Sequence, residues 1–317
     1  MLEPLSARLE RFELRPGVVT AWVAMGQAAC GVLRHRRPAA ILLAWTLGCA
    51  MPANAGPLQS RLRGFQVGAH RGGFWSVLQS TSGDFATSLE SGANVIEIDL
   101  RATKDGRVVV YHSDTLSKHT FCFGLIRDTT FVEIGRCGLL PTGTHIESFE
   151  DVLRWTGGKD VIVNAEFKDD EVIEPALALV DRYDAWDRVY FQANAHYERY
   201  ARARELSPRA NMLVNAGDME RLRWALDLGD PHLVVIGLRG EPMLTQEAVA
   251  LVHQYGKIAS ANSWPGARFQ ELFTAACDRL FAIGVDIAIT NNVRSCVAQR
   301  DAIRASDVLA KGTPARM

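Results

Sequence analysis

The sequence has no excess of either charge: its 317 residues include 35 lysines and arginines and 36 aspartates and glutamates. A chain without a strong overall field is not held on nucleic acid or on an anionic membrane by long-range attraction. We therefore expect no nucleic-acid partner. An anionic ligand would have to be bound by a local group of side chains.

The sequence is also poor in long apolar runs near its start. The run from Ala39 to about Ala50 is too short to span a bilayer comfortably. It follows a basic run, Arg34 to Arg37, and precedes the small residues Ala53-Asn54-Ala55. Basic, apolar and small-residue parts in this order are typical of a secretory signal, and a buried helix of a globular domain is the alternative.

We expect cleavage after Ala55, so that residues 1–55 form a leader with a signal peptide and Cys49 is removed with it. The long lead before the basic run is consistent with a translation start nearer Met25. The mature protein is then exported, periplasmic or secreted, with no stable membrane insertion.

Cysteine is scarce, and none of the six cysteines shows the spacing typical of a zinc site. Cleavage would leave Cys122, Cys137, Cys277 and Cys296. In an oxidising compartment, Cys122 with Cys137 would close a short loop, and Cys277 with Cys296 would tie together the last helical region. The sequence allows three connectivities, and four buried free thiols are the alternative.

From residue 65 to 305, short apolar runs alternate with amphipathic stretches such as EVIEPALALVDRYDAW and TQEAVALVHQYG. This alternation predicts a parallel sheet, and we prefer one closed (β/α)8 barrel to an open sheet. There are nine candidate strands rather than eight, so that one run lies outside the barrel or is a loop. The runs are Val67 to His70, Val95 to Leu100, Val108 to His112, Val161 to Phe167, Val189 to Gln192, Asn211 to Asn215, Leu233 to Gly237, Ile258 to Ala261 and Ile287 to Thr290. Residues 306–317 are expected to form a flexible tail.

Polar residues gather where these strands end, which is where parallel barrels carry their chemistry. Side chains two apart on a strand share a face, so each of the pairs Glu97/Asp99 and Glu166/Lys168 should point one way. Three converging carboxylates repel unless a cation neutralises them, and oxygen ligands favour Ca²⁺ or Mg²⁺ over zinc. Ordinary ion pairs with Arg71, Arg101 or Lys168 are the alternative. The complete set is His70, Arg71, Glu97, Asp99, His112, Glu166 and Lys168.

Two histidines at neighbouring strand ends change the interpretation. A lone His-Arg-Gly in VGAHRGGFWS is weak evidence, because many surface turns carry one. His70 and His112 together can serve as general base and general acid near neutral pH, and Arg71 and Lys168 can bind phosphate oxygens. The residues therefore predict a phosphate-ester site.

The motifs AHRGG, GANVIEIDLRATKDGRVVVYH and NAEFK closely resemble the glycerophosphodiester phosphodiesterase family in order and spacing. The resemblance is strong from about Val67 to Lys168 and weaker as far as Asn292. It implies a TIM-type barrel of the PLC-like phosphodiesterase kind and a phosphoric diester hydrolase. It also implies that His70 and His112 form an acid–base pair. The resemblance further implies that Glu97, Asp99 and Glu166 hold a divalent cation and that Arg71 and Lys168 bind the phosphate.

The sequence departs from the family pattern at three places. LQST, residues 78–81, replaces Pro-Glu-Asn-Thr and keeps only the threonine; His-Asp becomes His112-Ser113; and a late Thr-Asp becomes Thr290-Asn291. These changes remove carboxyl groups that orient or tune such a site. Phe74 and Trp75 are candidates for an apolar lip beside it.

The resulting expectation is a metal-dependent enzyme that hydrolyses glycerophosphodiesters, or related small lysolipid-like molecules, to sn-glycerol 3-phosphate and an alcohol. We assign His70 as base and His112 as acid. The alternatives are a phospholipase D-like activity on lysophospholipids or sphingomyelin, and an inactive exported protein that binds phosphate esters.

Overall fold

The computed structural model describes residues 57–73, 80–264 and 276–312. The expected leader, with its cleavage site, and the lip residues Phe74 and Trp75 lie outside these ranges. Within them, no helix has both the length and the apolar character that a membrane span requires.

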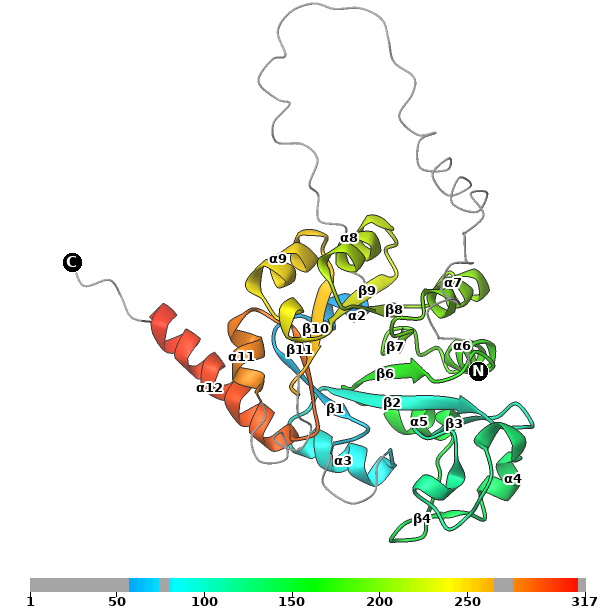
Figure 1. Cartoon of the computed structure of the whole chain (residues 1–317). Coiled ribbons are helices and arrows are strands. Elements are labelled where there is room, and N and C mark those ends of the chain that lie inside the picture. The colour runs from blue at the N-terminus through cyan, green and yellow to red at the C-terminus, as the bar shows by residue number, and fades with distance from the viewer. Residues whose placement is uncertain (1–56, 74–79, 265–275, 313–317) are drawn as a thin grey trace, which may run out of the picture. The chain divides into compact units, whose positions relative to one another are not determined.

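Eight parallel strands close into a barrel, because β1 pairs with β2 on one side and with β11 on the other (Figure 1). The predicted (β/α)8 barrel is therefore confirmed. The strands in order around it are β1 (Gln66–His70), β2 (Val95–Ala102), β6 (Ile162–Phe167), β7 (Val189–Gln192), β8 (Met212–Ala216), β9 (Leu233–Leu238), β10 (Ile258–Asn262) and β11 (Ile287–Thr290).

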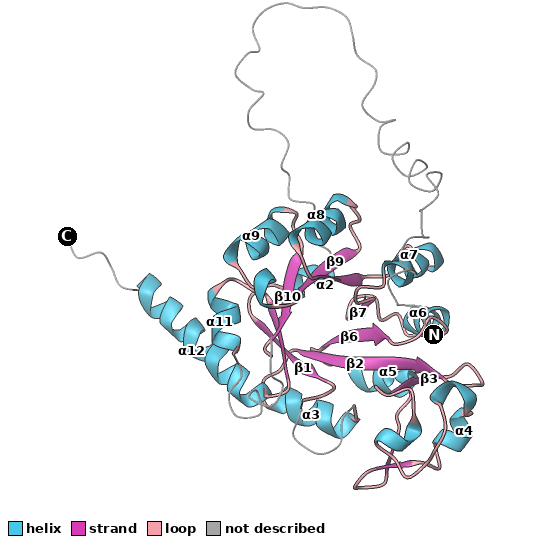
Figure 2. Ribbon diagram, viewed as in Figure 1, coloured by secondary structure: helices cyan, strands magenta, loops and turns pink. Residues whose placement is uncertain are grey.

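Helices surround the barrel, as Figure 2 shows. Side chains on the outer faces of the strands and on the inner faces of the helices form the largest apolar cluster. This is why the strands carry near-continuous apolar runs. The helices in chain order are α3 (Ser82–Glu90), α5 (Phe149–Thr156), α6 (Ile173–Arg182), α7 (Tyr197–Leu206), α8 (Met219–Asp227), α9 (Gln246–Gln254), α11 (Cys277–Ala282) and α12 (Val293–Gly312).

A second apolar cluster fills the inside of the barrel. It contains Tyr190 and Ile287 from the strands, and Leu58 and Leu62 from the short helix α2 (Pro57–Leu62). The barrel is therefore a packed core and not a pore, which leaves the opposite, carboxyl-terminal mouth for a site. Helix α2 precedes residue 65, the predicted start of the barrel, but shares this core.

One of the nine predicted strands, Val108 to His112, lies outside the barrel. β3 (Val108–Val110) is shorter than the expected Val108 to His112 and pairs antiparallel with the end of β2, with Leu100 opposite Val110. His112 is therefore not at the end of a barrel strand. The chain leaves the mouth along β2 and returns along β3, so His112 arrives back at the rim.

Residues 103–148 form an insertion between β2 and α5 with its own small core around Tyr111, Ile126 and Ile146. Its short elements are β3, η2 (Leu116–Lys118), η3 (Ile126–Asp128), α4 (Phe131–Ile134), β4 (Gly138–Leu139) and β5 (Thr144–His145). The cartoon shows this insertion beside the mouth of the barrel (Figure 1).

Both expected disulfides are present. Cys122 is bonded to Cys137 within the insertion, and Cys277 to Cys296, which joins α11 to α12. The free-thiol alternative is wrong. Helix α12 continues to Gly312, into the segment for which a flexible tail is expected.

Candidate active site

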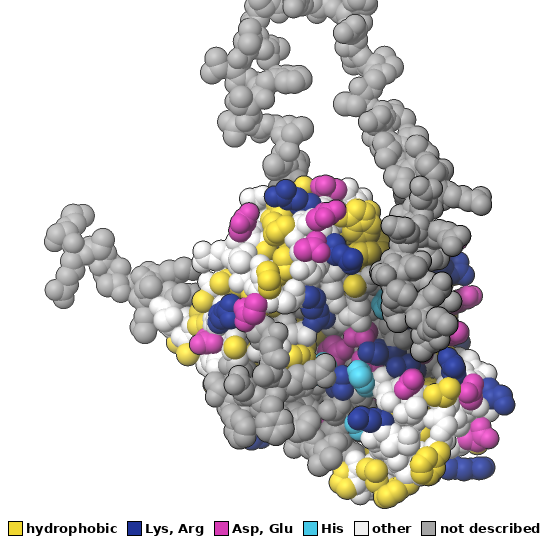
Figure 3. All heavy atoms as spheres, in the orientation of Figure 1, with side chains coloured by type: hydrophobic (Ala, Val, Ile, Leu, Met, Phe, Trp, Pro, Cys, Tyr) yellow, Lys and Arg dark blue, Asp and Glu magenta, His cyan; other side chains and the backbone are white. Residues whose placement is uncertain are grey.

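Strand register brings the predicted residues together at the mouth. His70 on β1 lies opposite Glu97 on β2, and Asp99 on β2 lies opposite Glu166 on β6. Three adjacent strands thus present these polar residues at the same end of the barrel, at two successive levels of the strand register. The surface view shows acidic, basic and histidine side chains gathered in the hollow beside the insertion (Figure 3).

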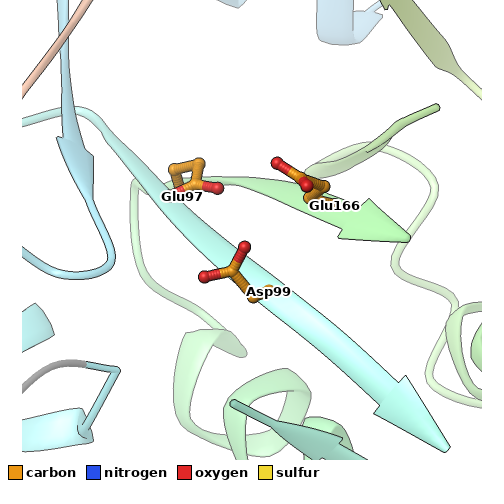
Figure 4. A group of neighbouring side chains, drawn as sticks. All are labelled: Glu97, Asp99 and Glu166. Atoms are coloured by element: carbon orange, nitrogen blue, oxygen red, sulfur yellow. The ribbon is translucent and has the colours of Figure 1, made fainter. Parts of the chain in front are cut away.

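The three carboxylates point toward one another (Figure 4). One oxygen from each of Glu97, Asp99 and Glu166 lies within 4.8 Å of the others, and all three residues are buried. Burial, and then the charges of Asp99 and Glu166, raise the pKa of Glu97 well above its usual range. A bound cation would relieve this repulsion.

One side-chain oxygen of Asp99 also favours a bound cation. Its Oδ2 is buried and accepts no hydrogen bond from the described residues, although Arg71 Nε lies 3.2 Å away. Buried carboxylate oxygens seldom lack partners, and hard carboxylate oxygens suit a hard divalent cation. The donor set of this cluster therefore fits Ca²⁺ or Mg²⁺.

The predicted ion pairs exist beside the cluster. Lys168 Nζ lies 2.6 Å from Glu166 Oε1 and 3.5 Å from Asp99 Oδ1. Arg101 does not join them, because it donates to the backbone oxygen of His112 and lies 3.6 Å from Asp169. Ion pairing and a carboxylate cluster thus coexist, with Arg71 and Lys168 on either side of β2.

The backbone turns sharply at Arg71, which has a positive φ of 52°. In this conformation its N–H donates to Glu97 Oε2 at 2.9 Å, so the residue contacts the carboxylates through backbone and side chain. Gly72 follows at φ 86°, and a Cβ there would lie 2.9 Å from the Phe85 ring. The glycine is needed both for the turn and for the space beside α3.

His70 is oriented by Asn291, whose Oδ1 lies 2.7 Å from His70 Nδ1. Because an amide oxygen only accepts, this contact requires the tautomer that carries the proton on Nδ1 and the lone pair on Nε2. That Nε2 lies 3.9 Å from Glu97 Oε2, and the ring packs on Trp264 with centroids 4.7 Å apart. Asn291 thus keeps an orienting contact with His70, although it lacks the carboxyl group of the family pattern.

His112 faces the same cavity from the base of the insertion. Burial, followed by the charges of Arg71 and Lys168, lowers its pKa to about 3. The imidazole is therefore neutral in the free site. An anion that offsets the two cations would favour its protonated form.

The seven predicted residues line one cavity of roughly 220 Å³ at the mouth of the barrel. Sequence reasoning missed part of its lining. Gln192 donates to Glu166 Oε2 at 2.9 Å and to Asn194 Oδ1 at 2.7 Å, which holds the carboxylate in place. Gln192 ends β7 and Arg239 directly follows β9, so the strand-end rule applied to every strand would have found both.

The model of the glycerophosphoryl diester phosphodiesterase family matches residues 70–295, well over half of the chain. The chain belongs to this family. The match includes all seven predicted site residues and confirms the predicted resemblance and the enzyme class.

Individual relatives agree with this assignment. A glycerophosphodiester phosphodiesterase of Bacillus altitudinis is 29% identical over 206 residues, which cover 59% of this chain and 81% of the relative. One from Caldanaerobacter subterraneus is 32% identical over 140 residues, or 41% of this chain and 58% of the relative.

Solved structures share the family fold. A putative glycerophosphoryl diester phosphodiesterase from Silicibacter pomeroyi has a TM-score of 0.65 at 19% identity, covering 78% of this chain and 98% of the other. An Oleispira antarctica phosphodiesterase in complex with its product sn-glycerol-3-phosphate has a TM-score of 0.62 at 19% identity, covering 77% and 99%. At these identities the likeness shows the barrel fold.

Proposed function

We propose that this family member is a metal-dependent hydrolase of glycerophosphodiesters that releases sn-glycerol 3-phosphate and an alcohol. The observation that carries the proposal is the juxtaposition, in one cavity, of the carboxylate cluster, two histidines and two basic side chains. The product bound to the structurally similar Oleispira antarctica phosphodiesterase supports the choice of substrate.

Glu97, Asp99 and Glu166 would hold one divalent cation, Ca²⁺ or Mg²⁺, because their oxygens converge and Asp99 Oδ2 accepts no hydrogen bond from the described residues. When bound, the cation would offset negative charge on the phosphoryl oxygens. Arg71 and Lys168 would bind the other phosphoryl oxygens by charge-assisted hydrogen bonds.

His70 would act as the general base. Its Nδ1 is occupied by Asn291, which leaves Nε2 to take the proton of the nucleophile, either water or the 2-hydroxyl of the substrate's glycerol. With the hydroxyl, a cyclic phosphate would form first and water would open it. In either case an oxygen–phosphorus bond forms as the bond to the departing alkoxide breaks.

His112 would protonate that alkoxide. This role requires the imidazolium, although His112 is neutral in the free site because its pKa is about 3. The negative charge of the bound phosphodiester would act in this direction, since it would offset part of the positive charge of Arg71 and Lys168, the two cations that lower the pKa after burial.

We also propose that the mature protein is exported to the periplasm or the medium. The signal-like leader motivates this, and two disulfides support it because such bonds persist in oxidising compartments.

Chelation tests the metal part of the proposal. EDTA should abolish turnover of bis(p-nitrophenyl) phosphate and of glycerophosphodiesters, and Ca²⁺ or Mg²⁺ should restore it, because three converging carboxylates without a cation repel an anionic substrate. Glu97→Gln, Asp99→Asn and Glu166→Gln should each mimic the chelator. A rate that EDTA leaves unchanged would contradict metal dependence.

A further inference from the structure

The side of the mouth opposite the carboxylates carries a third cation. Arg239 directly follows β9, which lies four strands from β2 in either direction around the eight-stranded barrel. Its backbone N–H donates to the oxygen of Ala216 at 2.9 Å, which anchors it at the rim. Its side chain lines the same cavity as Glu97 and Glu166.

The guanidinium of Arg239 makes no stabilising contact with another side chain of the described residues. Among the described residues it has no hydrogen bond and no ion pair, whereas another partly buried arginine, Arg204, is paired with Asp230. Burial lowers the pKa of Arg239, and Glu166 and Glu97 attract it only from a distance. A buried charge without a direct partner costs stability, so a ligand is the simplest reason for its presence.

The charges in the cavity leave room for such a ligand. The carboxylates of Glu97, Asp99 and Glu166 are balanced in number by the cationic side chains of Arg71, Lys168 and Arg239. With a divalent cation bound, the cavity would carry a net charge of about +2 by this count. One phosphodiester supplies a single negative charge and leaves the other positive charge unmatched.

The positions of the three cationic side chains suggest different roles for them. Arg71 and Lys168 both contact Asp99, so a phosphate held by them lies on the β1–β2–β6 side. Arg239 reaches the cavity from the far side, and the amide groups of Asn262, which ends the adjacent strand β10, and of Asn194, which follows β7, also line it. A guanidinium with neighbouring amides suits a carboxylate or a phosphate and repels an ammonium group.

We propose that Arg239 binds a second anionic group, a carboxylate or a phosphate, on the alcohol of the phosphodiester, and so selects anionic over cationic alcohols. This specificity rests on the proposed phosphodiesterase function. It combines attraction for one class of substrate with repulsion of the other.

Three nearly isosteric substrates test it: glycerol 3-phosphate esterified with glycolate, with ethylene glycol or with ethanolamine, whose ends are anionic, neutral and cationic. For the unaltered enzyme, kcat/KM should be highest for the glycolate ester and lowest for the ethanolamine ester. A fourth ester, of ethylene glycol phosphate, distinguishes a phosphate from a carboxylate as the preferred anion.

Arg239→Gln should lower kcat/KM for the glycolate ester by about 10- to 100-fold, the scale of a charge-assisted hydrogen bond. It should leave the ethanolamine ester unchanged or improve it. Arg239→Lys should restore part of the preference, because it restores the charge. Arg279→Gln is the matched control, since Arg279 is an exposed arginine paired with Glu241 away from the cavity.

Equal loss on all three esters would overturn the inference, because Arg239 would then serve the shared phosphate or the fold. An unaltered enzyme that shows no charge preference would overturn it as well. Absence of turnover on every diester, bis(p-nitrophenyl) phosphate included, would instead count against the proposed function. Calorimetric binding of the same esters to the unaltered protein and to Arg239→Gln would then decide the inference by itself.

Discussion

Asn291 shows how one substitution can keep a contact and lose a charge. It stands where the family pattern has an aspartate, and its Oδ1 still lies 2.7 Å from His70 Nδ1. The geometry that a carboxylate would impose is therefore kept by an amide oxygen. At the first departure, the retained Thr81 caps α3, because its hydroxyl oxygen accepts from the N–H of Asp84. The contact to His70 and the cap of α3 are thus both kept at these two departures.

Substitution of His112 should affect the rate of cleavage without affecting metal binding. His112→Ala should slow cleavage by about 10²-fold or more, the scale of a lost general acid, and leave metal affinity nearly intact. The loss should be smaller for a p-nitrophenyl ester, because that leaving group needs less protonation. Kinetics with both ester types and a metal titration would measure this. Metal affinity impaired as badly as in Glu97→Gln would contradict the role.

The lowered pKa of His112 also predicts how acid affects stability. Between pH 6.5 and about 3, the unfolded chain binds a proton at His112 that the folded chain does not. The free energy of unfolding should therefore fall as the pH decreases through this window. His112→Asn removes this contribution, so the variant should lose less stability than the unaltered protein. Urea unfolding of both proteins in EDTA at pH 7 and pH 4 measures the difference; equal losses would contradict the assignment.

At the scale of elements, the length of β2 decides where His112 lies. β2 has eight residues, more than any neighbouring strand, and its last three pair with β3. This antiparallel return carries the chain back to the mouth, and the oxygen of His112 is held there by Arg101. The insertion thus supplies one member of the histidine pair and the barrel supplies the other.

Removal of the Cys122–Cys137 bond should loosen the insertion more than the barrel. The bond joins residues 15 apart, and closing such a loop is worth about 3 kcal/mol in the chain-entropy model. Cys122→Ser should therefore increase hydrogen exchange in residues 113–146 and lower activity through His112. The double variant Cys277→Ser/Cys296→Ser is the matched control and should affect the α11–α12 region instead. Uniform exchange throughout the barrel in Cys122→Ser would show that the insertion does not unfold separately.

At the scale of the whole molecule, the packed barrel interior separates the two ends of the protein. Leu58 and Leu62 of α2 belong to the interior cluster. The seven predicted site residues all lie at the other end, in one cavity. Because α2 begins at Pro57, a chain cleaved after Ala55 would keep the segment that shares this core.

Export makes a direct prediction for the intact molecule. The mature chain should begin at about Gly56 and appear in a non-cytoplasmic fraction, because basic, apolar and small-residue segments precede that point. Amino-terminal sequencing of the purified protein from each cell fraction would measure this. An Ala53→Leu/Ala55→Leu variant is a suitable control, since it should block cleavage. An intact leader on the soluble unaltered protein would contradict the prediction.

The sequence by itself determined the barrel and the first set of site residues. Alternating apolar runs and amphipathic stretches specify parallel strands with covering helices, and parallel strands bring their carboxyl ends to one face. His70, Glu97, Asp99 and Glu166 are found in this way, because local order along each strand already fixes which end carries them. The cysteine spacing likewise allowed the two pairings that the structure contains.

Only the tertiary structure decided what depends on contacts between distant segments. The antiparallel direction of β3 follows from its pairing with β2, which an apolar run of three valines does not encode. The bond from Asn291 to His70 joins residues 221 apart, across the closure of the barrel. Arg239 gains its place opposite the carboxylates only once eight strands form a ring. Sequence patterns indicate whether each strand is buried or exposed. The strand register and the closure of the barrel decide which residues of different strands come into contact.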